Sequence, residues 1–302
     1  MKFLIAGATG LIGKRLSKVI IERNNEVNIL TTNRNIKQSI KGINIFYWNP
    51  ELDFIDEGCV KGVDVVINLA GSPIAQLWTR KAKKSILQSR VNSIELLYKA
   101  VSNDKSSKVR QFICASAIGL YKSDSKIIHN ENSKEFSKSF LGDTVCKWED
   151  ACDVFKNSTI KLVKIRIGLV LSLKGGFLKP IVMLTKLFLG TWFGKGRNIY
   201  SWIHIFDVVG AILFLVDKNS NGVYNLVAPR PVNSKNFMIE ISKKLNRRII
   251  LPSIPLKLIK VLTGKMLELI IFSQNVSCEK IIKEGFEYEF KDLNSALENL
   301  LK

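Results

Sequence analysis

The chain has 302 residues, of which 46% are hydrophobic and 24% are charged. This length suits one large domain or two ordinary ones, and the composition excludes a wholly disordered chain. Forty-six lysines and arginines against 26 acidic residues give a formal net charge of +20. Because the basic residues are scattered along the chain, we interpret them as a solvated surface and do not expect nucleic-acid binding.

Other features of composition point to the cytoplasm. No apolar run approaches the roughly 18 residues of a membrane span, so we expect no membrane partner. The five cysteines form no CxxC pair, which favours a reducing compartment. The two histidines, His129 and His204, lack metal-ligand spacing, so no metal site is expected.

The first predicted element is a buried strand at residues 3–6, and a glycine-rich turn separates it from a helix over residues 11–21. Further strands are predicted at 27–30, 43–48, 63–69, 111–116 and 161–171, with a long helix at 82–101. Strands that alternate with helices indicate βαβ units with right-handed crossovers. The sequence therefore predicts an α/β fold, a Rossmann-like doubly wound parallel sheet.

The rest of the chain has a different pattern. Residues 122–139 are polar and are predicted to form a loop. After residue 175, longer helical segments are separated by prolines, which favours a small, partly helical C-terminal lobe. We expect a main domain over residues 1–230, with residues 173–205 contributing to the lobe, and a small C-terminal domain over residues 231–302.

The turn after the first strand carries Gly7, Gly10 and Gly13 in a GxxGxxG spacing. A strand followed by such a turn and a helix brings backbone N–H groups and the positive helix end to one point. A pyrophosphate binds there only where no Cβ blocks its approach. The context of a βαβ unit therefore predicts a dinucleotide site.

The end of the second strand bears on the choice between NAD and NADP. An acidic residue there would bond the ribose 2′-hydroxyl of NAD, but none occurs between Val27 and Pro50. The chain instead offers Thr31, Thr32 and Arg34, and Arg34 could pair with a 2′-phosphate. NADP(H) is favoured, and NAD(H) stays open.

Five motifs in this order resemble the extended short-chain dehydrogenase/reductases: GATGLIG (7–13), INLAG (67–71), CASAIGLY (114–121), RIGLVLS (166–172) and WIHIFD (202–207). The chain is more narrowly similar to the atypical "epimerase family" branch, which carries a small C-terminal domain of unknown function. The marks of that branch are SPIAQLWT (72–79), QSR (88–90), CKWEDA (146–151), GVYNLVAP (222–229) and the run over 247–297.

The resemblance implies an NAD(P)-binding Rossmann domain with a small lobe over its cleft. With the residues singled out above, the candidate cofactor contacts are Gly7, Thr9, Gly10, Leu11, Ile12, Gly13, Thr31, Thr32, Arg34, Leu69, Ala70, Arg90 and Val170. The chain departs from its relatives at Thr32, where they commonly carry arginine. A direct clamp on the 2′-phosphate is therefore in doubt.

The superfamily's catalytic groups are missing. Its alcohol-oxidising members use a tyrosine made acidic by a lysine four residues on, with a serine or threonine sharing the substrate oxygen. Alignment on Glu149 places Leu141 at the tyrosine position and Val145 at the lysine position, and Ala117 stands where the serine would be. These three apolar side chains cannot move a proton.

Ser116, Tyr121 and Lys147 are the weak catalytic candidates that remain, with Asp143 and Glu149 nearby. Each has a structural alternative, because Tyr121 could be a packed aromatic, and Lys147 and Glu149 could form surface salt bridges or caps. Cys146 has no histidine near it in the motif. His204 and Arg166 are interpreted as structural residues.

Three hypotheses follow. The first is an NADP-dependent oxidoreductase or epimerase that acts on an unidentified small molecule. The second is a non-enzymatic, NADP-responsive binding or regulatory protein, which the three apolar residues favour. The third, a nucleic-acid-associated protein, rests on net charge alone. Whether the chain is an enzyme stays open at this point, as does a homodimer.

Overall fold

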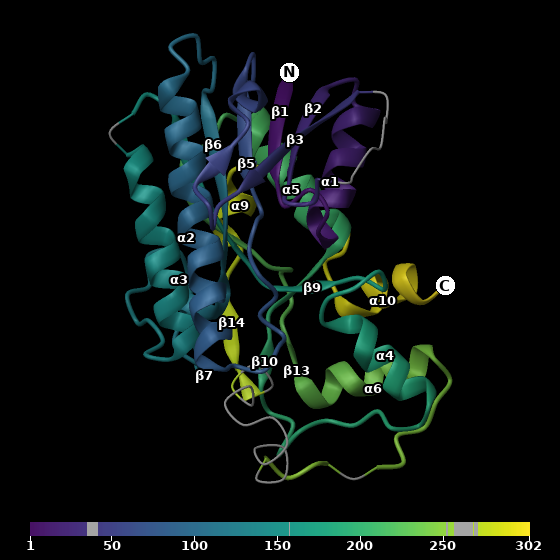
Figure 1. Ribbon diagram of the computed structural model, residues 1–302. Coiled ribbons are helices and arrows are strands. Elements are labelled where there is room, and N and C mark those ends of the chain that lie inside the picture. The colour runs from purple at the N-terminus through teal and green to yellow at the C-terminus, as the bar shows by residue number, and fades with distance from the viewer. Residues whose placement is uncertain (35–41, 157, 252, 257–267, 269–270) are drawn as a thin grey trace.

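The computed structural model describes residues 1–34, 42–156, 158–251, 253–256, 268 and 271–302 (Figure 1). Its centre is an eight-stranded sheet in the order β12-β8-β6-β5-β1-β2-β3-β4. Neighbouring strands are parallel except β3 and β4, which are antiparallel. The strands are β1 (Lys2–Ala6), β2 (Glu26–Thr31), β3 (Ile43–Asn49), β4 (Phe54–Ile55), β5 (Val65–Asn68), β6 (Gln111–Ala117), β8 (Lys161–Ile167) and β12 (Gly222–Leu226).

Helices cover both faces of this sheet (Figure 1). Successive side chains of a strand point to opposite faces. In β1, Phe3 and Ile5 join the core under α1 (Leu11–Glu22) and α5 (Ile205–Asp217). Leu4 and Ala6 join the core under α2 (Arg80–Asn103) and α3 (Phe140–Ala151). Burial on both faces explains why the central strands are predominantly apolar and do not alternate with polar residues. The predicted doubly wound fold is confirmed.

The predicted strand over 161–171 is divided in two. β8 ends at Ile167, and β9 (Leu169–Leu171) leaves the main sheet to pair with β11 (Trp202–His204). The break falls at Gly168, where a Cβ would lie only 2.8 Å from Val227 Cγ1. Glycine therefore permits the close crossing at which the chain leaves the sheet.

The prediction of a loop over residues 122–139 is wrong in part. Residues Asp124–His129 form β7, which pairs in parallel with β14 (Gln274–Val276). The partner strand lies about 150 residues further along the chain, so no local pattern could indicate the pairing. Figure 1 shows β14 and β7 side by side below the main sheet.

The second half of the chain builds a further packed cluster. α4 (Leu178–Lys186), α6 (Ser234–Lys244) and α10 (Leu293–Leu301) pack together, and β10 (Ile199–Tyr200) pairs with β13 (Val232–Asn233). The C-terminal α9 (Glu279–Lys283) instead contributes Ile281 to the core beneath α5. The boundary at residue 230 stays a prediction.

Short 3₁₀ helices complete the described elements: η1 (Glu57–Val60), η2 (Ile118–Leu120) and η3 (Cys152–Phe155). Over the ranges that the structure describes, no helix combines the length and the apolar character needed to cross a membrane.

Candidate functional site

The glycine turn lies at the point where the order of the strands reverses, with β2 on one side of β1 and β5 on the other. Gly7 has φ +79°, and a Cβ on it would lie 2.6 Å from the carbonyl carbon of Leu69. A Cβ on Gly13 would meet Ala8 Cα at 2.7 Å. Glycine is therefore required for the turn to pack against β5 and against its own helix.

The N-terminus of α1 points its polar groups outward. Its N-cap residue, Gly10, is exposed and offers no side-chain hydrogen bond, and the first turn holds no acidic residue. The free N–H groups and the positive end of the helix dipole are suited to a bound anion. Thr9 is also exposed, and Leu11 and Ile12 are half-buried.

The chain after β5 adjoins this turn. Leu69 and Ala70 are half-buried against Gly7. The next residue, Gly71, lies against the guanidinium of Arg90, because a Cβ there would be 2.9 Å from Arg90 Cζ. Gly176 lies between Val170 and the glycine turn. A Cβ added to Gly176 would be 3.2 Å from Leu11 Cδ2 and 3.6 Å from the carbonyl oxygen of Val170.

Arg90 is a buried cation, with 6% of its surface exposed. Its Nη1 donates to the carbonyls of Ile86 (2.8 Å) and Ser72 (3.2 Å), and its guanidinium lies 4.9 Å from the Trp148 ring centroid. No ion pair among the described residues includes it. Burial lowers the pKa of Arg90 to about 10, so the side chain stays charged at neutral pH.

The candidates after β2 lie at the same end of the sheet. Thr31 is buried, and its Oγ1 accepts a hydrogen bond from the backbone N–H of Asn33 at 3.1 Å. Thr32 and Arg34 are exposed, and the Arg34 guanidinium lies 4.3 Å from the ring centroid of Tyr47. The structure thus brings the glycine turn, Leu69–Ala70, Arg90 and Val170 together, with the end of β2 beside them.

The three apolar positions that replace the catalytic groups line one cavity of about 200 Å³. Ala117 ends β6, and Leu141 and Val145 lie one turn apart on α3. The remaining lining residues come from η2, from β8, β9, β10 and β14 (Gln274–Val276), and from loops: Ile74, Ile118, Gly119, Ile167, Gly168, Leu169, Phe177, Ile199, Tyr200, Ser201, Phe272 and Gln274.

The polar side chains of this lining mostly form hydrogen bonds within the protein. Ser201 Oγ donates to the carbonyl of Gln274 (2.7 Å) and accepts from the N–H of Val276 (3.0 Å). Gln274 Nε2 donates to the carbonyl of Tyr121 (2.6 Å). Burial raises the pKa of Tyr200 to about 12, so its phenol keeps its proton at neutral pH. No described lining residue is poised to exchange a proton near pH 7.

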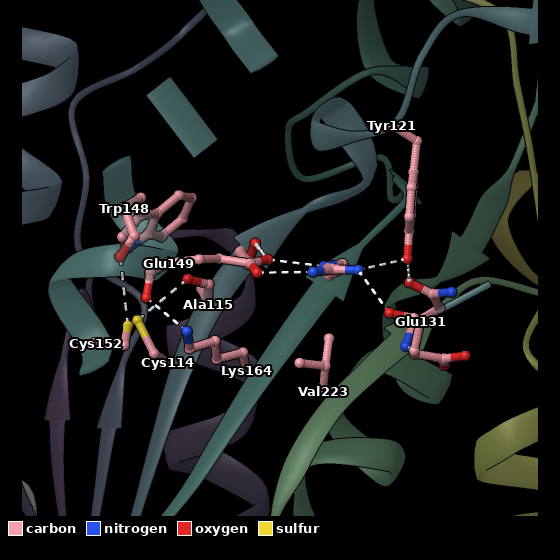
Figure 2. A network of polar contacts seen from close by, with 12 residues as sticks. Cys114, Ala115, Tyr121, Glu131, Trp148, Glu149, Cys152, Lys164 and Val223 are labelled. Carbon is pink, nitrogen blue, oxygen red and sulfur yellow. Dashed lines mark hydrogen bonds and ion pairs between the residues drawn. The ribbon is translucent and has the colours of Figure 1, made fainter. Parts of the chain in front are cut away.

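The weak candidates Ser116 and Tyr121 belong instead to a buried polar network, which Figure 2 shows. Ser116 Oγ donates to Glu149 Oε1 (2.5 Å), and Arg166 binds both oxygens of that carboxylate (2.8 Å each). Arg166 Nη1 also donates to the hydroxyl of Tyr121 (2.8 Å), which donates to Oδ1 of Asn225 (2.7 Å). The network joins α3, β6, β8 and β12.

The expectation that Glu149 lies on the helix surface is wrong. Its residue surface is 8% exposed, and Arg166 and Ser116 bond its carboxylate. The sequence did hold a signal for this burial, because Arg166 lies in the apolar run of β8. A buried arginine needs a buried carboxylate as its partner. Arg166 is structural, as predicted. Lys147, in contrast, is exposed.

Burial also shifts the pKa values of two other titratable candidates, His204 and Cys146. His204 is fully buried at the N-cap of α5, where its Nδ1 accepts from the N–H of Phe206. Burial lowers its pKa to about 4, so it is neutral at pH 7, and it is a core residue as predicted. Burial likewise raises the pKa of the Cys146 thiol. Within the described part of the chain, no cluster of metal-binding side chains occurs.

Sequence reasoning did not identify Ser201, Phe272 or Gln274 as site residues. Phe272 and Gln274 lie in the run over 247–297 that marks the branch, but nothing in that run assigns them to a site, and they reach the cavity from segments far apart in the sequence. No local signal could have identified them.

A doubly wound parallel sheet with a glycine turn at its switch point defines the class as a Rossmann-like dinucleotide-binding fold. The "NAD dependent epimerase/dehydratase family" matches residues 3–139, and "Domain of unknown function (DUF1731)" matches residues 251–300. An epimerase family protein of Staphylococcus aureus (strain N315) is 33% identical over 305 residues, covering 100% of this chain and 99% of the relative. The chain belongs to the epimerase family.

Two solved structures extend the comparison. The human epimerase family protein SDR39U1 (isoform 2), crystallised with NADPH, has a TM-score of 0.88 and 26% identity, covering 100% of this chain and 99% of its own. A nucleoside-diphosphate sugar epimerase from Corynebacterium glutamicum has a TM-score of 0.78 and 26% identity, and the match covers 100% of this chain and 58% of that one.

Proposed function

We propose that this protein binds NADP(H) at the switch-point edge of its sheet. The carrying observation is the turn over residues 7–13, where backbone N–H groups and an uncapped helix end face outward and side chains are excluded by packing. The pyrophosphate would be held there, with Leu69, Ala70 and Val170 toward the nicotinamide. The NADPH-bound human relative supports the same assignment.

Two cations favour the phosphorylated form of the cofactor. Arg34 is exposed beyond β2, where no acidic side chain would repel a 2′-phosphate, and Thr31 and Thr32 supply hydroxyls beside it. Arg90, buried and still charged, makes the neighbouring edge positive and so attracts an anionic ligand. We expect NADPH to bind more tightly than NADH.

The cofactor would supply a hydride donor or acceptor, and the chain's own residues decide what can accompany it. A sugar epimerase or alcohol dehydrogenase must move the proton of a hydroxyl. Ala117, Leu141 and Val145 line the cavity where that proton would be handled. We therefore propose an oxidoreductase- or epimerase-like protein, acting on a small molecule, that lacks the Ser-Tyr-Lys route.

The same apolar lining favours a second function, in which the protein binds NADP(H) and a ligand without turnover. NADPH absorbance distinguishes the two functions. Oxidation of NADPH in the presence of small aldehydes, ketones or apolar unsaturated compounds would establish an enzyme. Tight NADPH binding with no turnover across such a panel would favour the binding protein.

The test of cofactor binding compares two glycines. Gly7 and Gly62 both have positive φ, +79° and +69°, but a Cβ on Gly62 meets nothing within 4 Å. We expect Gly7→Ala to weaken NADPH binding at least about tenfold and Gly62→Ala to leave it unchanged, since both substitutions carry similar backbone strain. Calorimetric titration with NADPH and NADH measures this, and circular dichroism checks folding.

The proposal fails if the wild-type protein binds neither dinucleotide at millimolar concentration. It also fails if folded Gly7→Ala binds NADPH as the wild-type protein does.

A further inference from the structure

The outer face of α4 carries apolar side chains where a surface helix normally carries polar ones. The inner face of the helix is buried at Leu178, Val182 and Thr185. The opposite face presents Met183 and Leu184, which are 57% and 47% exposed, although an amphipathic helix places polar residues there. α4 lies in the lobe below the main sheet (Figure 1). Packing within the described part of the chain does not account for this apolar face.

The turn that ends α4 extends the apolar face. Leu187, Phe188 and Leu189 are 67%, 43% and 48% exposed. The N–H of Phe188 donates to the Thr185 carbonyl (3.0 Å) and the N–H of Leu189 to the Leu184 carbonyl (2.9 Å), which folds the turn back onto the helix. Contiguous exposed apolar patches mark interaction sites. The α4 surface, as we call this patch, consists of Met183, Leu184, Leu187, Phe188 and Leu189.

Phe188 occupies a strained backbone conformation within this turn. Its φ of +60° lies in the left-handed region, where a bulky side chain is rare and glycine is the usual residue at a helix end. The chain carries its glycine two residues later, at Gly190, where a Cβ would lie 2.5 Å from Thr185 Oγ1. Strained residues cluster at functional sites. The strain therefore favours a function for the aromatic ring of Phe188.

Exposed cations surround the α4 surface. Lys179 and Lys186 are exposed on α4 itself, and the guanidinium of Arg247 lies 5.2 Å from the ring centroid of Phe188. Arg248 is exposed beside Arg247. Among the described residues, no ion pair includes any of these four cations.

Carboxylates are scarce in the same region. The sequence contains no aspartate or glutamate over residues 154–206 or over residues 241–267. The acidic residues of the neighbouring helices α6 and α10, Glu240 and Glu298, are paired with lysines. The cations around the α4 surface are therefore left to attract an anionic partner.

We propose that the α4 surface docks on a membrane that contains anionic lipids. Apolar side chains at the acyl boundary and cations among the headgroups are the two contributions that hold peripheral proteins on such membranes. The expectation of no membrane partner was based on the lack of a membrane span, and docking of this kind needs none. The inference is independent of the proposed cofactor function.

Other occupants fit this surface less well. Single-stranded nucleic acid binds where aromatic side chains stack on its bases, and Phe188 is the only aromatic residue among the five. A second copy placed face to face would set one cation-lined surface against another, and like charges oppose that contact.

Vesicle cosedimentation tests the proposal with the full chain. One set of vesicles contains equal parts of phosphatidylcholine and phosphatidylglycerol, and the other contains phosphatidylcholine alone. We expect the wild-type protein to bind the mixed vesicles at least about tenfold more tightly, because the headgroups attract the cations. Binding should weaken as the salt concentration rises.

Phe188→Gly separates docking from folding. Glycine adopts a positive φ without strain, so urea unfolding should show no loss of stability. Affinity for the mixed vesicles should fall at least about fivefold, because the ring no longer enters the membrane. Leu52→Ser removes an apolar side chain that is 73% exposed elsewhere and should leave vesicle binding unchanged.

A second pair of variants tests the charges. Lys186→Gln combined with Arg248→Gln should weaken binding to the mixed vesicles at least about tenfold. Lys105→Gln combined with Lys108→Gln removes the same net charge from exposed positions after α2, and it should change binding by less than about twofold.

Three results would overturn the proposal: no binding of the wild-type protein to the mixed vesicles, wild-type binding by folded Phe188→Gly, or equal effects of the two double variants. Equal effects would show attraction by net charge alone. A dimer that Phe188→Gly abolishes, without any vesicle binding, would instead assign the α4 surface to a second copy of the chain.

Discussion

The buried polar network and the apolar cavity share two elements, β6 and α3, and have opposite chemistry. Adjacent residues at the end of β6, Ser116 and Ala117, belong to the network and the cavity respectively. On α3, Leu141 and Val145 line the cavity, and Glu149, one turn beyond Val145, is in the network. Positions four apart share one helix face. A single helix face therefore changes from hydrocarbon to carboxylate along its length.

The difference shows what the interior charges of this protein do. Arg166 and Glu149 hold α3 against the sheet and are saturated by each other and by Ser116 and Tyr121. None of them lines the cavity. The interior can accommodate ionised groups, so the apolar lining is a property of the cavity and not of the whole core.

The largest effect is expected from Glu149→Gln, which leaves the Arg166 guanidinium buried without its carboxylate. Breaking a buried pair from one side costs roughly 3–5 kcal/mol, because the remaining charge is uncompensated. Urea unfolding measures the loss. Glu279→Gln, which breaks an exposed pair with Lys283, is the control and should cause no measurable change. Equal stability of the two variants would contradict the role assigned to the network.

Val145→Lys places a charge in the cavity and should cost roughly 2–5 kcal/mol at pH 7. Burial would lower the pKa of the new lysine below its unfolded value. The unfolded chain then binds more protons, so stability should rise as the pH is raised toward 10. Unfolding curves at several pH values measure this, with Val154→Lys at a half-exposed position as control. A pH-independent Val145→Lys would show that the cavity is hydrated.

The smallest effect is expected from Ser116→Ala, which removes one hydrogen bond to a carboxylate. The loss should be about 1–3 kcal/mol, since Arg166 still neutralises Glu149. NADPH binding should not change, because Ser116 is buried and its hydroxyl bonds Glu149 inside the network. Calorimetric titration of the variant checks this. A large loss of NADPH affinity in a folded variant would contradict this and would assign Ser116 to the cofactor site.

Features that repeat along the chain could be predicted from it. Burial on both faces made β1, β5 and β6 readable as apolar runs, and Gly7, Gly10 and Gly13 marked the turn between strand and helix. The loss of the catalytic groups was also visible, because Ala117, Leu141 and Val145 stand at fixed offsets from motifs. Each of these signals is contained within one short stretch of the chain.

Contacts between distant segments could not be predicted. Gln274 reaches the Tyr121 carbonyl across 153 residues, and the pairing of β7 with β14 joins segments about equally far apart in the sequence. Glu149 was misjudged because the sequence of α3 does not reveal which helix face meets Arg166. Tertiary packing decides which residue becomes the partner of a buried charge. The sequence of a single strand or helix contains only one member of the pair.

A crystal structure of the protein with NADPH tests the central claim most directly. The account predicts that the diphosphate lies against the backbone of residues 7–13 and that the nicotinamide opens onto the cavity of Ala117, Leu141 and Val145. A ligand beside the reactive carbon of the nicotinamide should have no titratable side chain within hydrogen-bonding distance. A dinucleotide bound elsewhere, or a tyrosine, lysine or carboxylate turned toward that carbon, would contradict it.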